Sequence, residues 1–137
     1  MKKIFSVILV IALALSVCAL FASCDQTGND GEETFKIGII CLHDEKSTYD
    51  LNFLNAVEDA KNALGLDDSQ VIIMTNIPEG NECYEAAADL ADQGCNIVFA
   101  NSFGHEDFMI KAAKEFTDVQ FCHATGVKAH NEGLSNY

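Results

Sequence analysis

The chain has 137 residues and a formal net charge of −13, with 21 acidic side chains against 8 basic ones. A chain this acidic repels nucleic acid and anionic lipid surfaces, which argues against a nucleic-acid-binding function. Its length allows one small domain once any targeting segment has been removed.

The amino terminus has the pattern of a secretion signal. A basic start is followed by an almost wholly apolar run over residues 4–22, and then by Ser23 and Cys24. This order is typical of a signal peptide, and the Cys after small residues resembles a lipobox. We expect residues 1–23 to be removed and Cys24 to carry a lipid that anchors the protein at the extracytoplasmic face of the cell membrane. The alternative is a retained transmembrane helix, because the apolar run is near the ~18-residue length of such a helix.

The segment after the cleavage site predicts a flexible tether. Residues 25–34 contain no apolar side chain, so residues 24–34 would hold the following domain away from the membrane. Cleavage would also remove two lysines and change the formal charge from −13 to −15. The domain itself would span residues 35–137.

Four cysteines remain in the expected mature domain: Cys41, Cys83, Cys95 and Cys122. An even number outside the cytoplasm permits disulfides, although connectivity cannot be read from a sequence. Their spacing matches no compact metal motif. Because Cys41 and Cys122 lie in apolar, strand-like runs where buried free Cys is common, we favour unpaired thiols.

The domain shows strands alternating with helices. Short apolar runs predict the strands, and apolar residues at intervals of three or four predict the helices. Ser47 or Thr48 can cap the first helix, and Gly65 can end it. The predicted strands span 35–41, 71–75, 96–100 and 119–123, and the helices span 48–64, 82–93 and 106–116.

The first helix has a regular apolar pattern, which predicts one apolar face. The residues of that face are Leu51, Leu54, Val57, Ala60 and Leu64.

This alternation predicts a doubly wound parallel sheet of the α/β class, with right-handed crossovers. The tail from Ala124 onward is polar and shows no period. Because no helix follows the last strand to cover it, we expect an incomplete domain, with Val119 and Phe121 partly exposed and an open sheet edge.

Ligands of an open α/β sheet bind beyond the carboxyl ends of its strands, and polar residues gather there in this sequence. Hydrogen-bond acceptors combined with aromatic rings suit a polar, ring-bearing small molecule. The alternative is that these residues are polar because loops are solvated. The set comprises 43–49 after the first strand, Asn76 and Glu79 after the second, 101–107 after the third, and His123, Thr125, Lys128 and His130 after the fourth.

The same residues raise two other hypotheses, a metal site and a catalytic pair. His43, His105, His123 and His130 all belong to this set, which raises the hypothesis of a metal site, but no two have the spacing of a helical pair. Ser102 with His105 could form a nucleophile and base, yet both lie on one turn. There is no nucleophile elbow, P-loop or dinucleotide fingerprint. We therefore expect no metal, no cofactor and no enzymatic activity.

Four segments carry a family resemblance: KIGII at 36–40, HDEKSTYDLNF at 43–53, LADQGCNIVFANSFGHED at 90–107 and KEFTDVQFCHATG at 114–126. Through them the chain resembles the BMP family (basic membrane protein, PnrA-like), the lipoprotein substrate-binding subunits of ABC transporters. The resemblance implies the first lobe of a two-lobed, type I periplasmic-binding-protein fold. It also implies a purine nucleoside or related ligand between the lobes, with an ABC permease and ATPase as partners.

The resemblance further implies roles for individual residues. By motif position, Asp44 and Asp107 would bind polar groups of the ribose or base, and Tyr49 would stack on the base. His43 and Phe103 occupy motif positions at the same edge of the sheet.

Overall fold

The computed structural model describes residues 34–129 and 132–137, within a compact unit that spans Thr34–Tyr137. The predicted signal peptide, Cys24, all of the tether except Thr34, and His130 lie outside the described residues. Among the residues that are described, no helix is long and apolar enough to cross a bilayer.

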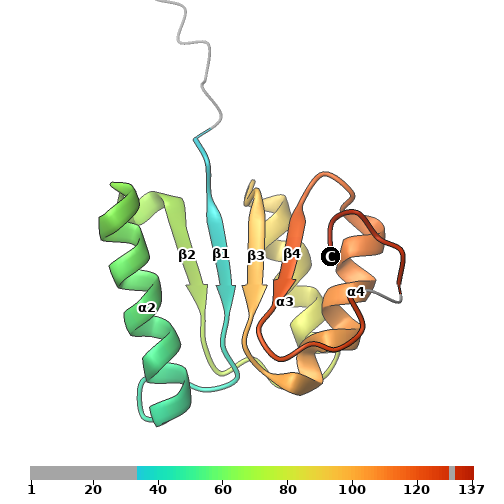
Figure 1. The fold of residues 1–137 in the computed structure, drawn as a ribbon, viewed down its shortest axis with the longest axis horizontal. Helices are drawn as coiled ribbons and strands as arrows, with labels where there is room; N and C mark the ends of the chain where they lie inside the picture. The colour runs from blue at the N-terminus through green and yellow to red at the C-terminus, as the bar shows by residue number, and fades with distance from the viewer. Residues whose placement is uncertain (1–33, 130–131) are drawn as a thin grey trace, which may run out of the picture. The chain divides into compact units, whose positions relative to one another are not determined.

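The unit is an α/β fold with one parallel sheet and three α-helices, as the sequence predicted (Figure 1). The observed elements lie within about two residues of the expected ones, the usual scatter of such boundaries. The strands are β1 (Ile37–Ile40), β2 (Val71–Met74), β3 (Ile97–Ala100) and β4 (Gln120–His123); the helices are α2 (Thr48–Leu64), α3 (Asn81–Asp92) and α4 (Glu106–Glu115). Two short 3₁₀ turns that the sequence did not predict, η1 (Asp68–Gln70) and η2 (Phe103–His105), precede β2 and α4.

The sheet has the order β2-β1-β3-β4, and every neighbouring pair is parallel. The register aligns the last residue of each strand: Ile40 pairs with Met74 and with Ala100, and Ala100 pairs with His123. All four carboxyl ends therefore reach the same edge, at the bottom of Figure 1. The loops that follow the strands are gathered along this edge.

The predicted ends of the first helix are confirmed. Ser47 is the N-cap of α2, and its hydroxyl accepts a hydrogen bond from the backbone N–H of Asp50. Gly65 closes the helix with φ 68°, in the left-handed region that favours glycine.

The core lies between the sheet and the pair of helices α3 and α4. Leu90 of α3 and Phe121 of β4 are both almost fully buried there. Gly38 of β1 allows this close packing, because a Cβ on it would lie 2.9 Å from Leu90 Cδ1. The expectation that Phe121 would be partly exposed is wrong, since its side chain faces α4 and is only 1 % exposed.

The carboxyl-terminal residues partly cover the edge of β4, which the sequence predicted to be open. The Asn136 carbonyl accepts a hydrogen bond of 2.8 Å from Phe121 N. Its side-chain amide donates to the carbonyls of Ala113, Phe116 and Val119. Asn136 therefore provides hydrogen-bond partners both for backbone carbonyls at and after the end of α4 and for a backbone N–H on the edge of β4.

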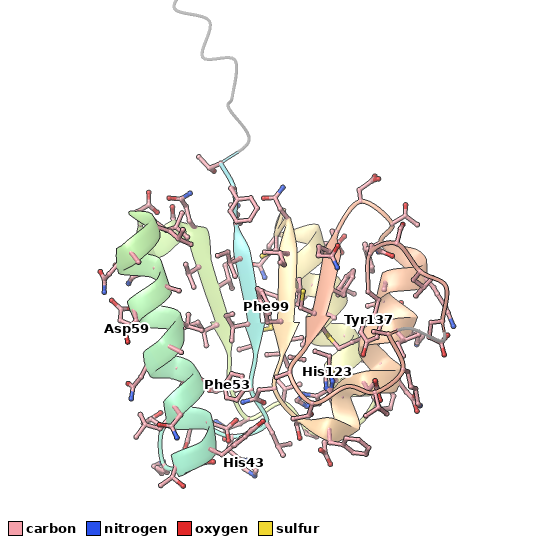
Figure 2. All side chains as sticks on the ribbon, in the orientation of Figure 1. His43, Phe53, Asp59, Phe99, His123 and Tyr137 are labelled. Atoms are coloured by element: carbon pink, nitrogen blue, oxygen red, sulfur yellow. The ribbon has the colours of Figure 1, made fainter. Side chains whose placement is uncertain are left out.

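The opposite face of the sheet is less well covered. The helix α2 lies beside this face, and the two line an open apolar cavity of about 500 Å³. Ile73 and Phe99 on the sheet remain 43 % and 40 % exposed, and Figure 2 shows Phe99 near the middle of the sheet. The apolar face predicted for α2 is only partly covered: Leu54 and Val57 are half-buried, whereas Leu51, Ala60 and Leu64 are exposed. The buried residue of the helix is Asp50.

Candidate functional site at the carboxyl edge of the sheet

Hydrogen bonds join the loops at the carboxyl edge into one structure. The Glu79 carboxylate, after β2, accepts from Ser102 Oγ at 2.5 Å and from Gly104 N at 2.9 Å. These bonds hold the turn η2 in place and lower the pKa of Glu79. His105 Nε2 donates to the Ile77 carbonyl at 3.0 Å, and His123 Nε2 donates to the Ser102 carbonyl at 2.5 Å.

Asp50 and Asn101 form the centre of this edge. Both side chains are almost fully buried, and Asn101 Nδ2 donates to Asp50 Oδ1 at 2.7 Å. Asn101 Oδ1 accepts from Leu42 N at 3.1 Å, while Asp50 Oδ1 also accepts from His43 N at 3.2 Å. The pair therefore attaches the loop after β1 to the end of β3.

The Asp50 carboxylate is stabilised in its charged form. Burial raises its pKa, but hydrogen bonds from Ser47, Asn101 and His43 together outweigh that effect and lower the pKa to about 2. A buried carboxylate that keeps its charge needs such donors, because the bare charge would be costly to remove from water.

Tyr49 presents an oriented aromatic surface. Its hydroxyl donates to the Asn101 carbonyl at 2.9 Å, and its ring lies 5.1 Å from that of Phe53 at an angle of 56°. The residue nevertheless remains 47 % exposed. A half-exposed ring fixed at both its hydroxyl and its edge can stack on a planar ligand at little cost in conformational entropy.

His43 and Asp44 lie next to this centre. His43 Nδ1 is 3.3 Å from Asp50 Oδ2, and its side chain is 59 % exposed. The Asp44 side chain accepts from Lys46 N at 3.0 Å, and this backbone bond is the main reason why its pKa is lowered. Asp44, His43 and Tyr49 therefore belong to one short segment that Asp50 and Asn101 hold against β3.

The other two predicted site residues lie further along the same edge. Phe103, in η2, is 64 % exposed. Asp107, in the first turn of α4, forms an ion pair with Lys128 and is 70 % exposed. Its neighbour Glu106 is buried and accepts from Val127 N at 2.5 Å and Lys128 N at 2.7 Å. The hydrogen bonds thus connect Asp107 to the segment after β4 rather than to Tyr49.

The geometry does not bring Ser102 and His105 together as a nucleophile and its base. The Ser102 hydroxyl donates to Glu79, and His105 Nε2 is engaged by the Ile77 carbonyl. His105 is fully buried, and burial lowers its pKa. Neither group is free to activate the other.

No metal-binding cluster of three or more His, Cys, Asp or Glu side chains occurs among the described residues. The four cysteines Cys41, Cys83, Cys95 and Cys122 are unpaired. Burial raises the pKa of Cys41 to about 11 and of Cys83 to about 12, so both thiols stay protonated at neutral pH and are poor nucleophiles.

Comparison with known proteins gives two kinds of result. No protein-family model matches the sequence. A purine-binding protein of Brucella abortus is 35 % identical over 100 residues, which is 71 % of this chain and 28 % of the relative. The chain thus spans well under a third of the length of this relative.

Two solved structures share the fold. One is a solute-binding protein of an ABC transporter system from Conexibacter woesei, with a TM-score of 0.54, 19 % identity, and coverage of 64 % of this chain and 28 % of that one. The other is a transcriptional activator of the comK gene from Bacillus halodurans, with the same TM-score, 15 % identity, and coverage of 64 % and 29 %. The fold is therefore similar to part of the fold of each of these two proteins. Because the second structure carries a different function, fold alone does not assign one here.

Proposed function

We propose that the chain is the first lobe of a lipid-anchored, extracytoplasmic solute-binding protein of the BMP family, which delivers a purine nucleoside or related molecule to an ABC transporter. The observation that carries this proposal is the 35 % identity over 100 residues to a purine-binding protein. The position of Tyr49, half exposed and oriented at the carboxyl edge, supports a planar ligand.

In this proposal the protein performs no bond chemistry. The ligand lies between this lobe and a second one, which corresponds to part of the remaining length of the relatives. Closure about a hinge then buries the ligand, and the closed form is recognised by the permease and ATPase. The hydrogen bond from Asn101 to Asp50 and the one from Ser102 to Glu79 make the edge of the first lobe rigid before the ligand arrives, which reduces the cost of binding.

The site can be tested in a chimaera that supplies the second lobe, in which this chain replaces the matched segment of the Brucella relative. We expect Asp107→Ala to weaken purine-nucleoside binding by about 1–3 kcal/mol, the cost of leaving ligand groups unpaired. Asp118→Ala is the matched control, because Asp118 is exposed and lies between α4 and the amino end of β4. Isothermal calorimetry measures both variants, and an unchanged affinity for Asp107→Ala would remove this residue from the site.

The membrane anchor is tested separately. When the chain is expressed in a bacterial host, we expect it to partition into detergent and to incorporate labelled palmitate. The Cys24→Ala variant should do neither, because it lacks the thiol that carries the lipid. Identical labelling of the variant and the parent chain would show that Cys24 is not the lipidation site.

A further inference from the structure

The described histidines are held in two different ways. His105 and His123 each bond a backbone carbonyl through Nε2, at 3.0 Å and 2.5 Å. A carbonyl can only accept, so both rings carry their proton on Nε2. In His43 the nitrogen that is held is Nδ1, which lies 3.3 Å from Asp50 Oδ2.

The partner of His43 is also an obligatory acceptor. The Asp50 carboxylate has a pKa of about 2, so it is ionised at neutral pH. Its other oxygen already accepts from Asn101 Nδ2 and from His43 N, and this leaves Oδ2 for the ring. The Nδ1 atom must therefore carry the proton of a neutral His43 ring, and its Nε2 must carry a lone pair.

The side chain that carries this lone pair lies at the candidate site. The His43 side chain is 59 % exposed, and Figure 2 shows it at the carboxyl edge of the sheet. Within the described residues, Nε2 of His43 has no hydrogen-bond partner. Tyr49, the proposed stacking surface, is bonded to the same Asn101 that holds Asp50. The ring nitrogen and the aromatic surface are thus positioned by one buried pair.

We propose that Asp50 fixes His43 as the Nδ1–H tautomer, so that His43 Nε2 acts as a hydrogen-bond acceptor and selects ligands that carry an N–H donor. Among purine nucleosides, it would favour a base that carries a 6-amino group over the same purine without that group. The ligand half of this inference rests on the proposed function, whereas the tautomer does not. Asp50 acts as a positioning residue, and His43 contacts the ligand.

The tautomer is read directly by long-range proton–nitrogen NMR of the full 137-residue chain at about pH 8, where free imidazole is neutral. We expect the Nδ1–H pattern for His43 and the Nε2–H pattern for His105 and His123 in the same spectrum. A His43→Gln sample assigns the signal. Asp50→Asn should return His43 to a mixture of tautomers. An Nε2–H pattern for His43 in the parent chain would overturn the inference, and this reading does not depend on how well any variant folds.

Selection is tested by titrating the same chain with adenosine and with purine riboside, which lacks the 6-amino group and has no N–H donor on its base, and following the His43 ring signals. We expect adenosine to bind about three- to tenfold more tightly, the effect of one additional hydrogen bond. His43→Ala should abolish the preference, because it removes the acceptor nitrogen. Equal affinities in the parent chain would overturn the selection. If neither nucleoside moves any signal at this edge, the proposed function and the selection both fail, while the NMR pattern still decides the role of Asp50.

Discussion

Replacing Phe121 with alanine should lower the free energy of unfolding by about 3–5 kcal/mol, the usual cost of truncating a buried aromatic side chain. Phe121 is 1 % exposed and packs in the core between the sheet and the helices α3 and α4. Because this core is small, the surrounding side chains have little freedom to fill the space that the ring leaves.

The chain offers a matched control on the neighbouring strand. Phe99 pairs with Cys122, the residue after Phe121, and its ring lies on the opposite, open face, where it is 40 % exposed. We expect Phe99→Ala to lower the free energy of unfolding by only about 1 kcal/mol, because less of the apolar surface of Phe99 is buried in the folded protein. Urea unfolding followed by circular dichroism measures both variants. Equal losses would show that the two faces of the sheet are equally covered, contrary to the structure.

The second large effect is the dependence of stability on pH through Asp50. The pKa of Asp50 falls from 3.8 to about 2 on folding. Since the folded-state pKa is depressed, the stabilisation is fully present well above pH 4 and is lost as the pH falls through about 2. A shift of this size corresponds to roughly 2 kcal/mol.

The variant Asp50→Asn isolates this contribution. At neutral pH it should unfold more easily than the parent by roughly 2 kcal/mol, and the difference should shrink as the pH approaches 2. Asp59→Asn is the control, because Asp59 is exposed on the same helix and points away from the sheet in Figure 2; it should change stability by less than about 0.5 kcal/mol. A pH-independent difference between Asp50→Asn and the parent chain would contradict the charged, hydrogen-bonded state of this carboxylate.

The order of elements could be predicted because each signal is local. Strand lengths follow from short apolar runs, and the ends of α2 follow from Ser47 and Gly65, which satisfy backbone groups near them in sequence. The position of the candidate site also followed, because parallel strands bring all their carboxyl ends to one edge. These steps need no knowledge of which face of the sheet is covered.

The errors arose where the outcome depends on distant residues. Phe121 was expected to be partly exposed because no helix follows β4, but the helix that precedes the strand, α4, covers it. A strand that is apolar on both faces does not reveal which side chains meet a helix, so Phe99 was not singled out. Asn136 could not be connected to β4 or to the end of α4, because its partners, from Ala113 to Phe121, lie 15 to 23 residues away in the chain. In each case the decisive contact is formed by the tertiary fold.

Within the site, the role of Asp50 could not be predicted for the same reason. Asp50 follows Ser47 in the S-x-x-D pattern of a helix N-terminus, and this local pattern already explains an acidic residue at that position. Its bond to Asn101 spans 51 residues and leaves no local trace in the sequence. Of the five residues chosen from the sequence, four are exposed and Asp44 is half-buried. Asn101 was included only as one of the polar loop residues, and Asp50, its buried partner, was not chosen as a site residue.

The most direct measurement of the central claim compares ligand binding by the 137-residue chain and by the chimaera that adds the second lobe. The account predicts clear calorimetric binding of a purine nucleoside by the chimaera and no binding tighter than about 1 mM, or roughly −4 kcal/mol, by the chain alone. At millimolar nucleoside, amide signals of the chain should move only at the carboxyl edge, around His43, Tyr49 and Asn101. Micromolar binding by the chain alone, or signal changes confined to the amino edge of the sheet, would contradict it.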